Sequence, residues 1–302
     1  MANRRLGGRV GPAREGVTIG QRVLGAVIFA VVFLGTLVWG EIPFMIAIML
    51  AAVISTVEMF SMFETKGEAV PTAAALGIAG SAAYVLFSHW RPLESFGYVT
   101  VGIIFLSFVW YMLVLRHVKP TKAVALTVFA PLLCGFCLCH LVMLRDLVDR
   151  SAGLKGPKNQ GMWIVLFLIV LIWIFDLAAW FVGRKIGRRK MAPTVSPNKS
   201  WEGAIAGVIA VLACSVVGRI IIQAILGHHK FNWFSYGLAI GIGVIVCVLG
   251  PLGDLSESLM KRDYGIKDMG SIIPGTGGVM DRLDSTLFTA PAVFYLIYFI
   301  IK

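Results

Sequence analysis

The stretch "IVLFLIVLIWIFDLAAWFVG", residues Ile164 to Gly183, decides the fold of this chain. An α-helix needs about 20 apolar residues to cross a hydrocarbon core about 30 Å thick, and this stretch supplies them with one charged residue, Asp176. A helix is favoured there because a bilayer offers no water to pair with free backbone groups. The stretch therefore predicts a membrane-spanning helix.

The rest of the chain has the same character. Of its 302 residues 58% are hydrophobic and 14% are charged, and the mean hydropathy is +0.85, far from the averages of soluble domains. We therefore expect an all-α, polytopic integral membrane protein, with about five spans in residues 1–160 and about four in residues 161–302. The nine predicted transmembrane helices lie near residues 23–40, 42–60, 70–87, 96–115, 123–144, 161–183, 203–226, 233–252 and 286–301.

The net charge of +11 bears on partners and on orientation. Basic residues occur in short clusters between apolar runs, without a long basic arm, so we expect no nucleic-acid partner. With the N-terminus in the cytoplasm, nineteen of the 27 Lys and Arg residues would lie inside and seven outside, which agrees with the positive-inside rule. The basic loop 145–160 would then lie outside, and it leaves the orientation of the front half open.

A carboxylate in the opening stretch is the first sign of a functional site. Asp176 lies within or at the rim of an apolar run, where a charge is costly without a partner or water. Such residues mark functional sites in membrane proteins, although Asp176 could also pair with a structural cation such as Arg219.

The segment "SPNKSWEG", residues 196–203, precedes the next apolar run. Pro197 suits the first turn of a helix, and a helix N-terminus beside Lys199 and Ser200 offers backbone donors and positive charge to a phosphate. Capping alone would explain the serines, but it would not explain Lys199 and Glu202 so close to the apolar boundary.

A second polar segment begins with "GPLGDLSESLMKR", residues 250–262. Asp254, Glu257 and Ser258 have helical spacing and could share one face, with Lys261 one turn further on. The following "IIPGTGGVMDRLD", residues 272–284, combines glycines with two carboxylates and an arginine. Carboxylates hold hard divalent cations that bridge to phosphates, and basic side chains neutralise phosphates directly. The combination predicts metal-assisted phosphate chemistry.

These motifs resemble those of a known family. "SLMKRDYGIKDMGSIIPGTGGVMDRLD", Ser258 to Asp284, closely resembles the signature of phosphatidate cytidylyltransferases, and "SPNKSWEG" with Asp176 resembles their second motif. The resemblance implies a nucleotidyltransferase of phospholipid biosynthesis that converts CTP and phosphatidic acid to CDP-diacylglycerol and pyrophosphate. It implies a Mg²⁺ cofactor, leaving a second cation open, and a homodimer in the lipid bilayer whose active site faces the cytoplasm. Residues 161–302 would be the catalytic region.

The resemblance also assigns site residues. Asp254 and Asp281 match the positions expected to hold the metal. Together with these two, the catalytic positions are Lys261, Lys267 and Arg282. The substrate-binding positions are Asp176, Ser196, Lys199, Ser200, Glu202, Ser258, Arg262, Asp268, Gly275, Thr276, Gly277, Gly278 and Asp284.

One departure from the family pattern concerns Thr276, which stands where the family has histidine. A threonine cannot act as an acid near neutral pH. The attacking phosphate monoester, however, has a second pKa near ~6 and needs no base, and phosphoryl transfers depend chiefly on positioning and electrostatics. We therefore expect activity with Thr276.

The sequence leaves two other functions open. A CTP-dependent lipid kinase of the polyprenol or phytol type would release CDP instead of pyrophosphate. A transporter would carry intramembrane charges and broken helices in both halves, whereas the polar motifs here are confined to the back half.

Overall fold

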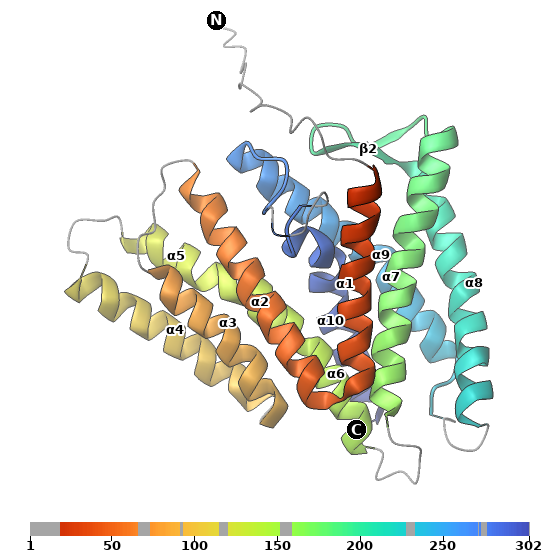
Figure 1. Ribbon diagram of the computed structural model, residues 1–302, viewed down its shortest axis with the longest axis horizontal. Coiled ribbons are helices and arrows are strands. Elements are labelled where there is room, and N and C mark those ends of the chain that lie inside the picture. Colours follow the sequence, from red (N-terminus) through yellow and green to blue (C-terminus); the bar gives the residue numbers. More distant parts are fainter. Residues whose placement is uncertain are drawn as a thin grey trace, which may run out of the picture.

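The computed structural model describes residues 19–65, 73–90, 93–114, 120–151, 159–227, 233–270, 272 and 277–301. Helices dominate these residues, and a single two-stranded sheet joins them (Figure 1). The helices are α1 (Ile19–Trp39), α2 (Glu41–Glu64), α3 (Ala73–Trp90), α4 (Glu94–Leu113), α5 (Pro120–Pro131), the π-helical turn η1 (Leu132–Phe136), α6 (Cys137–Ser151), α7 (Gln160–Ile186), α8 (Trp201–Leu226), α9 (Tyr236–Tyr264) and α10 (Met280–Ile301).

The expected polytopic all-α fold is confirmed. Within the described residues, eight helices are long and apolar enough to cross a membrane, the segment from α5 through α6 counting as one. A ninth, shorter apolar helix covers Leu24–Trp39 in α1. Each predicted span therefore corresponds to a helix.

Two helices extend beyond their predicted spans into the second polar segment. Helix α9 continues past residue 252 to Tyr264, and α10 begins before residue 286, at Met280. Gly265 ends α9 because it adopts a left-handed conformation, φ 71°, that suits glycine. The polar residues of the second segment consequently project from the ends of two helices.

A short hairpin was not predicted. Strands β1 (Lys190–Ala192) and β2 (Ser196–Ser200) pair antiparallel before α8. The expectation that Pro197 begins a helix is wrong, because Pro197 lies in β2 and α8 begins at Trp201. Ser200 is the N-cap, and its hydroxyl accepts a hydrogen bond from the Gly203 amide at 3.3 Å.

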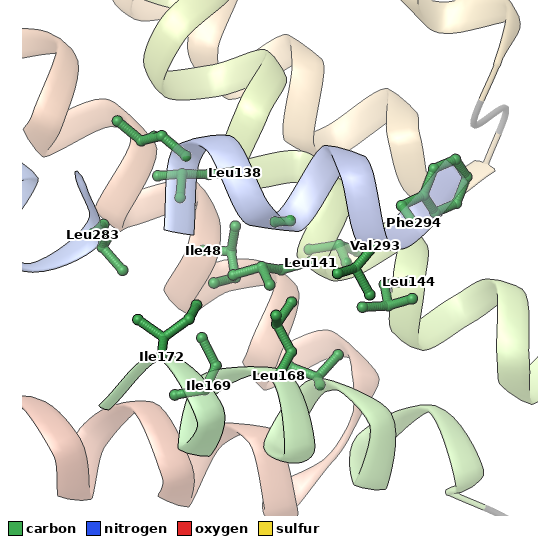
Figure 2. Close-up of a cluster of buried hydrophobic side chains, with 14 of the residues drawn as sticks. Ile48, Leu138, Leu141, Leu144, Leu168, Ile169, Ile172, Leu283, Val293 and Phe294 are labelled. Carbon is green, nitrogen blue, oxygen red and sulfur yellow. The ribbon is translucent and has the colours of Figure 1, made fainter. Parts of the chain in front are cut away.

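The hydrophobic core joins helices from both halves of the chain. Figure 2 shows Ile48 of α2, Leu141 of α6, Leu168 of α7 and Val293 of α10 in one cluster of buried side chains. Apolar packing therefore crosses residue 160, while the division into two functional regions stays a prediction.

The polar segments gather at one end of the helix bundle. In Figure 1 the hairpin lies at the top, beside the end of α7 and the start of α8, and α10 ends at the bottom, near the label C. Helix α1 starts at the same end as the hairpin. This arrangement places the hairpin where the polar end of α9 can reach it.

Candidate active site

Close packing of α9 against α10 brings two carboxylates together. A Cβ on Gly253 would overlap the carbonyl oxygen of Asp284, so only glycine permits this approach of the two backbones. Asp254 follows Gly253 directly, and the Asp254 and Asp284 carboxylates interact electrostatically. The glycine thus sets the distance between two acidic positions that the sequence singled out.

Lys261 links two further carboxylates in the same cluster. Its ammonium group donates to Oδ1 of Asp281 at 2.8 Å and to Oε1 of Glu257 at 3.3 Å. Oδ2 of Asp281 accepts from the backbone amides of Met269, at 3.0 Å, and Gly278, at 2.7 Å. Asp281 is therefore held in place by three donors.

Glu257 lies at the centre of the cluster, although no motif assigned it to the site. It is 1% exposed, and it interacts with both Asp281 and Asp284. Its second oxygen, Oε2, has no hydrogen-bond partner in the described part of the protein. The signal in the sequence was its helical spacing, three residues after Asp254 and four before Lys261.

The hairpin segment reaches this cluster directly. Lys199 Nζ forms an ion pair with Oδ2 of Asp254 at 2.5 Å, and Nε of Arg262 donates to the carbonyl of Val195 at 3.2 Å. The two polar segments, far apart in the sequence, therefore meet.

Asp176 of α7 belongs to the same group of charges. It interacts electrostatically with Asp284, Asp254 and Lys199. Arg219, the other candidate partner of Asp176, donates to the Phe234 carbonyl at 2.9 Å and lies over the ring of Tyr236. The structure thus gives Asp176 a place at the site.

Several expected pocket residues have local structural contacts. The Glu202 carboxylate accepts from the backbone amides of Arg188 and Arg189, which joins α8 to the start of the hairpin. Ser258 donates to Oδ1 of Asp254 at 3.4 Å. Ser196 lies in β2.

The remaining expected positions lie around the cluster. Lys267 and Asp268 are exposed after the end of α9, and Nε of Arg282 is buried without a hydrogen-bond partner in the described part. Gly277 has a positive φ of 95°. Gly275 and Thr276 lie outside the described residues.

Sequence reasoning missed Glu58, which reaches the site from α2. Its two carboxylate oxygens accept hydrogen bonds from the amides of Val279, at 3.0 Å, and Met280, at 2.9 Å. The signal was present in the sequence, because Glu58 is a carboxylate within an apolar run, like Asp176.

The cluster suits a divalent cation that arrives with a phosphate ligand. Among the described residues, no three His, Cys, Asp or Glu side chains form a ready-made metal site. The carboxylates nevertheless outnumber the ammonium groups, and within the described residues Oε2 of Glu257 is buried without a hydrogen-bond partner. Mg²⁺ commonly uses one or two carboxylates together with substrate phosphates and water. Asp254 and Asp281 supply oxygen ligands of this kind, and in the structure they pair with Lys199 and Lys261 respectively. That the two carboxylates hold one ion stays a prediction. The acidic side chains are Asp176, Asp254, Glu257, Asp281 and Asp284, and the basic ones are Lys199 and Lys261.

Comparison with known proteins identifies relatives of the whole chain. The model of the cytidylyltransferase family matches residues 20–300. Phosphatidate cytidylyltransferase of Bacillus subtilis (strain 168) is 29% identical over 284 residues, covering 93% of this chain and 98% of that protein. The Staphylococcus aureus (strain COL) protein of the same name is 30% identical over 279 residues, covering 91% and 98%. That of Haemophilus influenzae is 38% identical over 191 residues, covering 63% and 65%.

Proposed function

Because the chain belongs to the cytidylyltransferase family, and is thus a nucleotidyltransferase, we propose that it transfers the cytidylyl group of CTP to phosphatidic acid. The products are CDP-diacylglycerol and pyrophosphate. The observation that carries the proposal is the ion pair between Lys199 and Asp254, which unites the two polar segments beside the Lys261 cluster.

The reaction is an in-line displacement at phosphorus. A phosphate oxygen of phosphatidic acid forms a bond to the α-phosphorus of CTP, and the bond from that phosphorus to the bridging oxygen of the β-phosphate breaks. The electron pair leaves with pyrophosphate. The attacking phosphate is already largely anionic at neutral pH, so the protein needs to position it and neutralise charge.

The residues divide this work between cation binding and phosphate binding. Asp254 and Asp281 would hold Mg²⁺, which supplies positive charge to the phosphates when bound. Lys199 and Lys261 lie against these carboxylates and donate to phosphate oxygens. Arg262 keeps the hairpin against the end of α9 through the Val195 carbonyl.

The position of the cluster suits a lipid substrate. It lies toward one end of a bundle of membrane-spanning helices, so CTP enters from water and the acyl chains of phosphatidic acid stay in the bilayer. The excess of Lys and Arg on that side supports a cytoplasmic site, with the N-terminus also inside. We also propose that the protein forms a homodimer in the bilayer, as the resemblance to the family implies.

Product analysis tests the reaction. Purified protein is incubated with α-labelled CTP, Mg²⁺ and phosphatidic acid, and both products are identified. We expect the label in CDP-diacylglycerol, with one pyrophosphate for each lipid formed. Release of CDP with a polyprenol or phytol substrate would instead indicate a lipid kinase, and unchanged substrate moved across proteoliposomes would indicate a transporter.

A further inference from the structure

Glu58 is a buried carboxylate that the reaction outlined above does not use. It lies on α2 and is 4% exposed, and it is the one charged side chain among the buried residues of that helix, which are mostly apolar. Burying a carboxylate in such surroundings is costly unless hydrogen bonds compensate it. Its two bonds to the amides of Val279 and Met280 provide that compensation.

These two amides belong to the N-terminus of α10. The first amides of a helix have no partner within the helix, and its dipole favours a negative charge there. The usual cap is a side chain just before the helix, but here the carboxylate comes from α2, 221 and 222 residues away in the sequence. Glu58 therefore fixes the start of α10 to another helix.

Two glycines make room for this contact. A Cβ on Gly270 or on Gly278 would overlap the Glu58 carboxylate. Gly278 does not have a positive φ, so its backbone would accept alanine. Glycine is needed there because the carboxylate occupies the space that a Cβ would fill.

Glu58 and Asp281 act on successive residues of one segment. The Gly278 amide donates to Asp281, and the next two amides, of Val279 and Met280, donate to Glu58. Asp281 itself lies one residue beyond Met280, so the backbone that carries it is held by Glu58 directly.

We propose that Glu58 is a positioning residue: it fixes the segment from Gly278 to Asp281 so that the Asp281 carboxylate is held ready for catalysis. The inference rests on the proposed cytidylyltransferase reaction. The proposal gives a function to Glu58, an acidic residue of the N-terminal half, whereas both family motifs lie in the C-terminal half.

The first experiment compares Glu58→Gln with Glu64→Gln in the purified full chain. Glu64 is exposed at the end of the same helix and serves as the matched control. Glutamine keeps the size of the side chain, but it has one oxygen and one NH₂ group in place of the two carboxylate oxygens. Its NH₂ group cannot accept the hydrogen bond from one of the two backbone amides. We expect Glu58→Gln to lower kcat about 10- to 100-fold, while the KM for CTP changes less than about threefold.

Hydrogen exchange provides a readout that does not depend on activity. In Glu58→Gln the amides of Val279 and Met280 should exchange faster, while the cores of α7 and α8 keep the exchange rates of the wild type. Unchanged exchange at these two amides, an unchanged kcat, or faster exchange throughout the protein with a lower Tm would overturn the proposal. If wild-type protein makes no CDP-lipid, the proposed reaction fails, and exchange alone then decides whether Glu58 holds the segment.

Gly278→Ala disturbs the same contact while leaving Glu58 in place, and a double-mutant cycle tests whether its effect acts through Glu58. Gly278→Ala should lower kcat about 10-fold or more, because its Cβ displaces the carboxylate. In the Glu58→Ala background that space is empty, so Gly278→Ala should reduce kcat by less than about threefold further. Equal effects in both backgrounds would contradict a direct contact.

Discussion

Hydrogen bonds to both oxygens of Asp281 fix the orientation of its carboxylate. One of its oxygens accepts from Lys261, and the other accepts from two backbone amides. A carboxylate held in this way keeps one orientation and loses little entropy when a cation or a phosphate-bound metal approaches. The role of Asp281 can therefore depend on its negative charge, on its shape, or on both.

Replacing Asp281 with asparagine separates these two properties. Asparagine has nearly the same shape, but it cannot neutralise Lys261 or a metal. We expect kcat/KM to fall by about 100-fold or more, measured as CDP-diacylglycerol formed, because electrostatic stabilisation is lost. Asp263→Asn, at an exposed position near the end of α9, is the control. Undiminished turnover of Asp281→Asn would remove Asp281 from the metal site.

Thr276 gives a second prediction at this scale. We expect Thr276→His to change kcat less than about threefold, because positioning and charge supply most of the rate of phosphoryl transfer. The measurement is the initial rate of pyrophosphate release with CTP and phosphatidic acid. Activity that appears only after the histidine is introduced would show that the family's acid is required.

The sequence singles out the acidic residues of the motifs, but it does not reveal the residues from other helices that hold them in place. Asp254 and Asp281 stand in an ordered motif, whereas Glu58 is a single carboxylate in α2 whose partners lie 221 and 222 residues away. Helical spacing placed Glu257 on the correct face, but its central position depends on how closely α9 meets α10. Contacts of this kind follow from tertiary packing, which local patterns do not encode.

At the scale of elements, hydropathy predicts the spans but not where the polar ends begin. A run of 20 apolar residues defines each span, yet α9 continues into charged sequence as far as Gly265. The hairpin escaped prediction because its strands are only three and five residues long and neither shows an alternating apolar pattern. Both features shape the site.

The contact between α9 and α10 can be tested at Gly253. We expect Gly253→Ala to lower both activity and stability, the latter by about 1–3 kcal/mol, because its Cβ meets the Asp284 carbonyl. Gly250→Ala, in the same helix, is the control, since its Cβ would lie 4.0 Å from the nearest atom, the Cβ of Ser285. Thermal unfolding in detergent and the rate of turnover are measured for both. Equal behaviour of the two variants would argue against a site set by this contact.

The hairpin can be tested through Arg262. Its side chain donates to the Val195 carbonyl at an exposed position, where such a bond contributes only about 1 kcal/mol. We expect Arg262→Ala to raise the KM for CTP several-fold, with faster hydrogen exchange in β1 and β2 and little change in Tm. Arg188→Ala is the control, because Arg188 bonds Glu202 through its backbone amide. Hairpin exchange equal to that of the wild type would contradict this role.

At the scale of the whole molecule, the distribution of Lys and Arg predicts the orientation in the membrane. The predicted outer loop 145–160 was the one segment that opposed an inside N-terminus. In the structure α6 extends to Ser151, and Arg145 is buried within it, where it donates to the Gly40 carbonyl at 2.6 Å. A buried arginine that bonds the backbone serves packing, so it carries less weight as a topological signal.

Chemical labelling tests the orientation that this argument supports. With the N-terminus inside, the turn of the hairpin at Pro193 is cytoplasmic and Leu93, before α4, faces outward; both positions are exposed. Pro193→Cys and Leu93→Cys are made separately, and the unsubstituted chain, with its five cysteines in apolar helices, gives the background. A membrane-impermeant maleimide should label Leu93→Cys in intact cells and Pro193→Cys only after permeabilisation. The reverse pattern would place the phosphate site on the side where CTP is absent, and the proposed reaction could not then operate in the cell.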